Sequence, residues 1–179
     1  MNSLKRLFFE QTLRHWHFED LVKESQRSRE RVSYFLKELR KEDVVKRIKP
    51  RREMPYYVAH RENPKFRTEK QLFGLTRLEQ SGLFEHLASC PGIETAIIFG
   101  SFARGDWNKS SDVDLFIYGH DEDFDKAAFE LKLQRNIQVF SFQQPKRMQE
   151  ELEPAVIPNI IKGFNIKGTI EPFGVSINA

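Results

Sequence analysis

The sequence of 179 residues carries a formal net charge of +3, with 39% hydrophobic and 31% charged residues. This balance is typical of a soluble globular protein and excludes a disordered chain. No run of residues approaches the roughly 20 apolar residues that cross a bilayer, and residues 1–7 lack the apolar core of a signal peptide. The single cysteine, Cys90, excludes an intrachain disulfide and a zinc site built from several cysteines. We therefore expect a cytoplasmic protein without a membrane partner.

The charge is distributed unevenly along the chain. Residues 1–67 contain 18 Lys and Arg against 10 Asp and Glu, a net of +8, whereas residues 68–179 contain 11 against 16, a net of −5. The composition changes near Glu62, Asn63 and Pro64, where polar residues and a proline interrupt the apolar pattern. We expect two domains with different partners, at residues 1–62 and 63–179.

Three segments with helical spacing of apolar residues come first. A helix is expected from Leu4 to about Trp16, and a short segment follows at residues 18–24. Ser28 is expected to cap a third helix. The apolar face of that helix repeats at i, i+3, i+4 and i+7, through Val32, Phe35, Leu36 and Leu39.

Two short strands are expected next, at residues 44–48 and 56–59, joined by a positively charged turn. Five of the seven residues from Lys46 to Arg52 are basic. Lys and Arg on a protruding hairpin can neutralise phosphates and release counterions, which supplies affinity without sequence information. The alternative is a helical module for dimerisation, whose charges only solvate its surface.

The order helix, helix, helix, hairpin over roughly residues 1–60 resembles the winged helix-turn-helix family. The resemblance implies that the third helix enters the major groove of DNA while the hairpin, or wing, contacts the backbone. The residues that we assign to nucleic-acid binding are Arg29, Ser33, Lys37, Lys46, Arg47, Lys49, Arg51 and Arg52.

A buried strand is expected at residues 95–99, and it ends in Gly100 and Ser101. Residues 102–105 can begin a helix. A strand that turns at glycine into a helix exposes backbone N–H groups that hold phosphate. Glycine allows the phosphate to approach closely, and the Ser101 hydroxyl adds a donor.

Two aspartates begin the following strand, in the sequence Asp112-Val113-Asp114. Because side chains alternate along a strand, Asp112 and Asp114 are expected on one face and the apolar residues on the other. Two carboxylates on one face repel each other unless a cation lies between them. Mg²⁺ suits this arrangement, since it binds a few carboxylate oxygens and completes its shell with water and substrate phosphate.

The sequence from Ala96 to Tyr118, AIIFGSFARGDWNKSSDVDLFIY, resembles the signature of the DNA polymerase β-like nucleotidyltransferase superfamily, especially its minimal nucleotidyltransferase branch. The resemblance implies that Gly100 and Ser101 hold a nucleoside triphosphate and that Asp112 and Asp114 are catalytic ligands of Mg²⁺. It also places Arg104 and Lys109 near the phosphates. The implied fold is α+β, with a mixed sheet flanked by helices after the winged helix. The whole chain resembles a prokaryotic winged-helix protein that carries such a nucleotidyltransferase domain.

A third carboxylate, which in that family helps to activate the attacking hydroxyl, is missing from the expected place. Residues 136–142 form the later strand and contain no acid. The alternation of faces puts Gln138 on the side of the aspartates, and glutamine can neither take up a proton well nor neutralise a second metal ion. Asp125 and the acidic residues before it are expected to begin the helix at residues 124–133.

These features leave three functions open. The first is an enzyme that transfers a nucleoside monophosphate, from ATP as the first choice, to an unknown acceptor. The second is a DNA-binding regulator or antitoxin-like protein that binds nucleotide without catalysis, which the missing acid favours. The third is a winged-helix repressor with a structural dimerisation domain. Under this interpretation, the occurrence of the Gly-Ser turn together with the two aspartates is a coincidence. The sequence does not decide whether the chain forms a homodimer.

Overall fold

The computed structural model describes residues 2–169 and 173–174. The chain divides into two compact units. Unit 1 consists of residues 1–70 and 107–109, and unit 2 of residues 71–106 and 110–179, each within the described part of the chain. The division at residue 70 falls inside helix α4 (Pro64–Gln80). The domain boundary after residue 62, which the composition suggests, stays a prediction.

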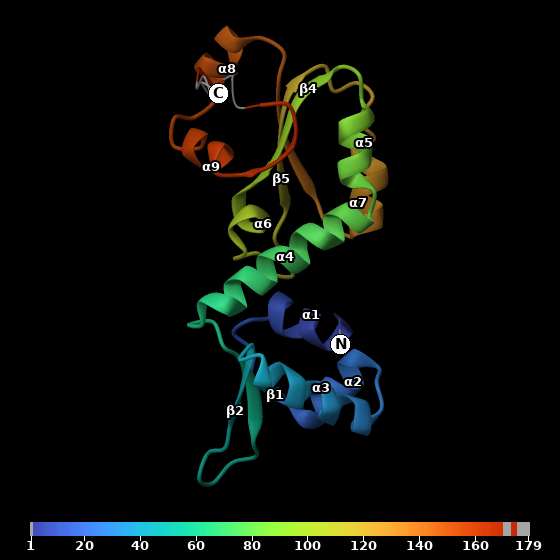
Figure 1. The fold of residues 1–179 in the computed structure, drawn as a ribbon, viewed down its shortest axis with the longest axis vertical. Helices are drawn as coiled ribbons and strands as arrows, with labels where there is room; N and C mark the ends of the chain where they lie inside the picture. Colours follow the sequence, from blue (N-terminus) through green and yellow to red (C-terminus); the bar gives the residue numbers. More distant parts are fainter. Residues whose placement is uncertain (1, 170–172, 175–179) are drawn as a thin grey trace. The chain divides into compact units, whose positions relative to one another are not determined.

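Unit 1 is built from three helices and a small antiparallel sheet (Figure 1). The strands lie in the order β1-β3-β2, and Arg47 of β2 lies directly opposite Tyr57 of β3. The three helices followed by a hairpin are those that the sequence predicts. In chain order the elements are α1 (Asn2–Glu10), β1 (Trp16–His17), α2 (Phe18–Ser25), α3 (Arg29–Lys41), β2 (Val45–Ile48) and β3 (Tyr56–Ala59).

The first helix is shorter than its apolar spacing suggests. We expected it to continue to about Trp16, but α1 ends at Glu10 and Trp16 begins strand β1. Trp16 is fully buried and pairs with Tyr57, and the guanidinium of Arg14 lies 3.9 Å from the centre of its ring. The burial of this large ring in the sheet outweighs the helical preference of the residues after Glu10.

The helices of unit 1 share a core of buried apolar residues, which includes Phe8, Leu21, Val32 and Leu39. Ser28 caps α3 as expected, since its hydroxyl accepts a hydrogen bond from the backbone N–H of Arg31.

An ion-pair network also lies in unit 1. The side chain of Lys5 is almost buried and pairs with Glu42, at 3.1 Å, and with Glu69. Burial lowers the pKa of Lys5, but the two carboxylates more than offset that effect and raise the pKa above its ordinary value.

A three-residue segment, Trp107–Lys109, completes unit 1 from much later in the chain. Trp107 is fully buried, and its indole N–H donates a hydrogen bond to the carbonyl of Lys70 at 3.0 Å. Its ring meets that of Phe9 edge to face, with the centres 6.4 Å apart. The backbone N–H of Lys109 donates to the carbonyl of Glu10 at 3.0 Å.

Unit 2 contains a four-stranded mixed sheet in the order β6-β5-β4-β7. Strand β5 runs antiparallel to β4 and parallel to β6, and β4 runs antiparallel to β7. After α4, the elements are α5 (Leu83–Ser89), β4 (Ile93–Phe99), α6 (Gly100–Arg104), β5 (Val113–Gly119), α7 (Lys126–Leu133), β6 (Ile137–Phe142), α8 (Pro145–Glu151), α9 (Ile157–Ile161) and β7 (Phe164–Lys167). Ser81 and Gly82 separate α4 from α5.

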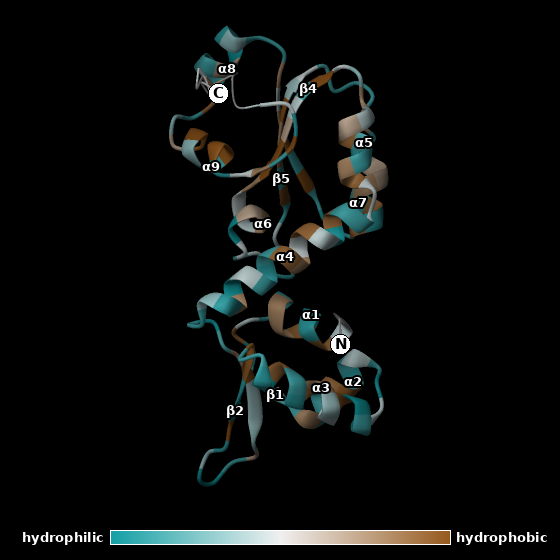
Figure 2. Ribbon diagram, in the orientation of Figure 1, coloured by the Kyte–Doolittle hydropathy of each residue, from teal (hydrophilic) through white to brown (hydrophobic). Residues whose placement is uncertain are grey.

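Helices lie on both sides of this sheet, α5 and α7 on one and α8 and α9 on the other (Figure 1). A buried cluster fills the space on the second side, and it joins Phe99 and Phe116 of the sheet to Met148 of α8 and Ile160 of α9. Figure 2 shows strands β4 and β5 in brown, in contrast to the teal turn of the β2–β3 hairpin. These observations fit the mixed α+β fold that the sequence predicts. No helix among residues 2–169 and 173–174 is long and apolar enough to cross a membrane.

Candidate functional site

The turn between β4 and α6 requires glycine at residue 100. Gly100 has φ +65°, a left-handed conformation that side chains rarely adopt, and α6 begins at this residue. A Cβ atom at residue 100 would overlap the Asp114 carboxylate. The Gly-Ser turn and the second aspartate therefore lie against each other, although 13 residues separate them in the chain.

The two aspartates lie at the start of β5, as the sequence predicts. Asp112 is exposed and immediately precedes the strand, while Asp114 is half-buried within it. Asp114 lies opposite Phe99 of β4 on one side and opposite Gln138 of β6 on the other. Because directly opposite residues point to one face of a sheet, these three side chains share a face, and the alternation adds Asp112.

The electrostatic surroundings of Asp114 favour a cation. Burial raises the pKa of the Asp114 carboxyl above its ordinary value. A hydrogen bond from the backbone N–H of Ser101 opposes this rise, the neighbouring charge of Asp112 adds to it, and the charge of Arg104 opposes it. The Ser101 N–H, expected to hold phosphate, is thus hydrogen-bonded to the aspartate here.

The two basic residues expected near the phosphates differ in their surroundings. Arg104 lies at the end of α6, and its guanidinium donates two hydrogen bonds to Asp106, at 3.1 and 3.3 Å. Its charge still acts on Asp114. Lys109 belongs to unit 1, where its backbone bonds to Glu10. The roles of both side chains in nucleotide binding stay predictions.

The register of β6 puts Gln138 beside Asp114, as the alternation of strand faces predicts. Gln138 is exposed, so its amide carbonyl can reach a bound ligand, but it carries no charge. Asp125 caps α7, as expected for an acid at the start of this helix: its carboxylate accepts a hydrogen bond from the backbone N–H of Ala128 at 3.0 Å. Among the described residues, no three or more His, Cys, Asp or Glu side chains cluster closely enough to hold a metal ion.

The donor set nevertheless suits a hard divalent cation. Two carboxylates on one face, one of them half-buried with a raised pKa, provide negative charge that is only partly compensated by Arg104. Mg²⁺ commonly uses one or two protein carboxylates and takes the remaining oxygens from water and substrate phosphate. Asp112 and Asp114 would hold the ion, with the oxygens of a bound phosphate completing its shell.

Arg135 is a site residue that the sequence did not reveal. Its guanidinium donates a hydrogen bond to the carbonyl of Ser111 at 2.8 Å and lies 5.4 Å from the centre of the Phe102 ring. Arg135 therefore joins the residue before Asp112 to the helix that follows Gly100. An arginine at a helix end is common, and only the parallel pairing of β5 with β6 brings it to this place.

The basic residues of unit 1 form a second candidate site. Ser33 and Lys37 are exposed on α3, and the hairpin turn is exposed along most of its length. Arg29 pairs with Glu19 at 2.6 Å, and Lys46 lies 3.9 Å from Glu62. Of the eight residues assigned to nucleic-acid binding, the cations without a salt-bridge partner in the described part of the chain are Lys37, Arg47, Lys49, Arg51 and Arg52.

One known family matches part of unit 2. Residues 83–162 match the family model "Polymerase beta, Nucleotidyltransferase". This match supports the superfamily that the Gly-Ser turn and the aspartates suggested. A nucleotidyltransferase domain implies a nucleotide substrate, and members of this family typically use a divalent metal ion. The matched segment contains β4, α6, β5 and β6, and it includes Gly100, Asp112, Asp114 and Gln138.

Similar solved structures include a mutant of the toxin-antitoxin MntA-HpeT, with 13% identity and a TM-score of 0.33, over 56% of this chain and 75% of that one. Another is a protein assigned as a nucleotidyltransferase from Sulfolobus solfataricus, with 22% identity and a TM-score of 0.29, over 46% of this chain and 78% of that one. With TM-scores and identities this low, neither similarity supports a conclusion about this chain. A search of curated proteins found no match.

Proposed function

We propose that unit 2 binds a nucleoside triphosphate, with ATP as the first choice, together with Mg²⁺, and transfers its nucleoside monophosphate to an acceptor. The observation that carries this proposal is the contact between Gly100 and the Asp114 carboxylate, with Asp112 on the same face. The family match over the same residues supports this reading.

In the proposed reaction, an acceptor hydroxyl attacks the α-phosphorus of the triphosphate. A new phosphorus–oxygen bond forms, the bond to the β-phosphate breaks, and pyrophosphate leaves. Mg²⁺, when bound, would offset the negative charge of the phosphates and of the attacking oxygen. Asp112 and Asp114 orient that charge-compensated triphosphate, and Arg104 adds a positive charge beside it.

Among the residues that the structure describes in this site, none is an evident base for the acceptor proton. Gln138 stands on the face where a third acid would act, and its amide cannot accept a proton at neutral pH. This observation favours a second candidate function, a regulator or antitoxin-like protein that binds nucleotide without transferring it. In either case we propose that unit 1 binds DNA as a winged helix, through the unpaired cations of α3 and the hairpin.

The test is incubation of the full chain with Mg²⁺ and each labelled triphosphate, alone and with protein and nucleic-acid acceptors, while pyrophosphate release is measured. Turnover with any acceptor supports the transferase. Binding without turnover across all acceptors supports the regulator. Absence of Mg²⁺-dependent nucleotide binding in a folded protein contradicts both.

A further inference from the structure

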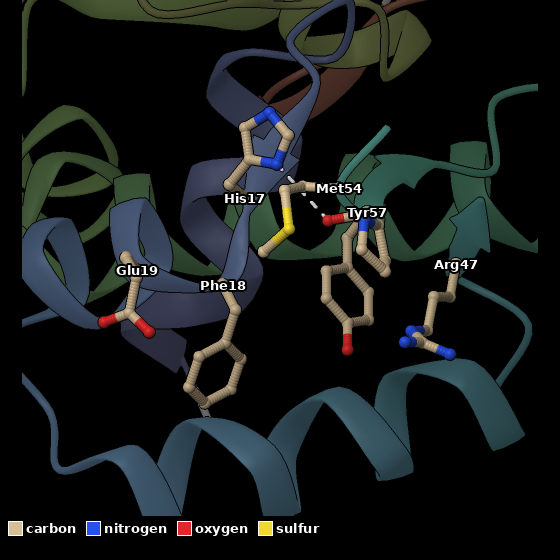
Figure 3. Close-up of a pocket in the computed structure, with 7 residues that line it drawn as sticks. His17, Phe18, Glu19, Arg47, Met54 and Tyr57 are labelled. Carbon is tan, nitrogen blue, oxygen red and sulfur yellow. Dashed lines mark hydrogen bonds between the residues drawn. The ribbon is translucent and has the colours of Figure 1, made fainter. Parts of the chain in front are cut away.

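A hollow of about 480 Å³ lies in unit 1 beside the β2–β3 hairpin. Its apolar wall consists of Phe18 at the start of α2, Met54 and Pro55 of the hairpin turn, and Tyr57 of β3. Figure 3 shows the rings of Phe18 and Tyr57 and the guanidinium of Arg47 extending in the same direction. This volume falls within the range of pockets that take small organic groups.

The polar groups of the hollow leave one uncompensated positive charge. Arg47 lies opposite Tyr57 across the hairpin and has no salt-bridge partner within residues 2–169 and 173–174. The carboxylate of Glu19 is paired with Arg29 at 2.6 Å. His17 donates from Nδ1 to the carbonyl of Pro55 at 3.3 Å, which leaves Nε2 as an acceptor in the neutral ring. The hollow therefore suits a flat apolar group that carries an anion.

A second hollow, of about 660 Å³, lies on the α3 side of Tyr57. Lys37 and Arg40 line it, and neither has a salt-bridge partner in the described part of the chain. Glu30 is the one carboxylate in its lining, and hydrogen bonds from its own backbone N–H and from Ser28 lower its pKa. Tyr57 thus lines both hollows, and their three cations, Arg47, Lys37 and Arg40, outnumber their two carboxylates, of which Glu19 is already paired.

We propose that unit 1 binds single-stranded nucleic acid, with one unstacked base in the hollow of Phe18 and Tyr57 and the flanking phosphates on Arg47, Lys37 and Arg40. Bases in a duplex stack on each other, so a duplex can meet the cations but cannot fill the apolar hollow. An unstacked base offers its flat face to aromatic side chains, the usual basis of single-strand recognition. This proposal rests on the nucleic-acid binding proposed for unit 1, narrows it to a preference for single strands over duplex, and is independent of catalysis.

The test measures the affinity of the full chain by fluorescence anisotropy at one fixed salt concentration. The probes are a labelled single strand of about 12 nucleotides, a duplex of the same sequence, and a single strand whose central nucleotides are abasic. We expect the single strand to bind more tightly than the duplex, and the abasic strand at least fivefold more weakly than the intact one. Equal affinity for the abasic strand, or tighter binding of the duplex, overturns the proposal.

Two variants locate the base. Tyr57→Leu and Phe18→Leu keep an apolar side chain but remove the aromatic face, and each should weaken single-strand binding at least fivefold while changing duplex binding less than twofold. Tyr56→Leu is the matched control, because Tyr56 is the adjacent residue of β3 and stacks on His15, 4.3 Å between ring centres, outside the hollow. Unchanged single-strand affinity in both aromatic variants contradicts the assignment. A protein that binds no nucleic acid at all instead contradicts the role proposed for unit 1.

Discussion

The two units hold their charges in opposite ways. In unit 2, Asp114 is half-buried in the sheet, and Gly100 lies against its carboxylate. In unit 1, Arg51 and Arg52 are exposed on a turn and have no salt-bridge partner among the described residues. What a half-buried charge such as Asp114 can bind depends on the position of each neighbouring atom. Exposed cations such as Arg51 and Arg52 contribute to binding mainly through the number of positive charges in one region.

The two arrangements of charge suit different kinds of ligand. A metal and phosphate site needs ligands fixed to within a fraction of an ångström, which a strand end and a glycine turn provide. A surface that attracts the phosphates of a polymer needs only several cations within reach. Substitutions should therefore act sharply and individually in unit 2, and gradually and additively in unit 1.

The largest effect is expected from completing the site of unit 2. Gln138→Glu restores a carboxylate beside Asp114 without a change of volume. General-base assistance is typically worth about 10²–10⁴-fold in rate, so pyrophosphate release should rise by about a hundredfold or more. Gln149→Glu, which adds the same charge on the exposed face of α8, is the control and should leave the rate unchanged. A wild-type protein that already turns over rapidly would show that the base lies elsewhere.

Gly100→Ala tests whether binding in unit 2 depends on the precise position of the atoms in the site. The change forces alanine into a left-handed conformation and drives its Cβ into the Asp114 carboxylate. We expect the free energy of unfolding to fall by about 2 kcal/mol or more, and Mg²⁺-dependent nucleotide binding to be lost. Denaturant titration measures the first effect and calorimetry the second.

Gly174→Ala separates the two contributions in that experiment. Gly174 has φ +71°, but a Cβ there meets no atom within 4 Å. It should therefore show only the backbone strain, of about 1 kcal/mol, with nucleotide binding intact. If the two variants behave alike, the contact between Gly100 and Asp114 has no special role.

Removal of the two charges tests the metal site directly. The double variant Asp112→Asn and Asp114→Asn keeps the volumes but removes the negative charge, so nucleotide affinity with Mg²⁺ should fall at least tenfold, about 1.4 kcal/mol. The pair Asp121→Asn and Asp123→Asn has the same spacing and charge change just beyond β5, and should have no effect. Unchanged affinity in the folded Asp112 and Asp114 variant would rule out the metal site.

The smallest effect per residue is expected in unit 1. Arg51→Ala with Arg52→Ala should weaken nucleic-acid binding similarly for all sequences, and reduce its salt dependence by about one unit for each lost phosphate contact. Lys146→Ala with Lys162→Ala removes two exposed cations from unit 2 and serves as the control. A salt dependence equal to that of the wild type would show that the hairpin turn does not contact phosphates.

Much of unit 2 follows from local patterns in the sequence. The β-branched run before Gly100 predicts β4, and the alternation around Asp112 and Asp114 predicts β5 and its polar face. The face of Gln138 follows from the same alternation. These predictions succeed because strand periodicity and the glycine turn are properties of neighbouring residues, which the fold does not override here.

The remaining features depend on contacts between distant residues. The end of α1 was predicted wrongly because the burial of Trp16 against β3, not local propensity, decides it. Arg135 was missed because its bond to Ser111 exists only after β5 and β6 pair. No pattern in the sequence indicates that Tyr57 lines a hollow, because the hollow is formed by three separate segments of the chain.

Because Trp107 belongs to unit 1 but lies far along the chain, unit 1 cannot be completed until residue 107 has been synthesised. Unit 1 needs residues 107–109, so it is incomplete when residue 70 leaves the ribosome. At a synthesis rate of about 5–20 residues per second, roughly two to eight seconds pass before Trp107 is available to pack against Phe9. During that interval β4 and the Gly100 turn are made. A fragment that stops at residue 62 or 70 would permanently lack this tryptophan, and it should expose Phe9 and aggregate more readily than the whole chain.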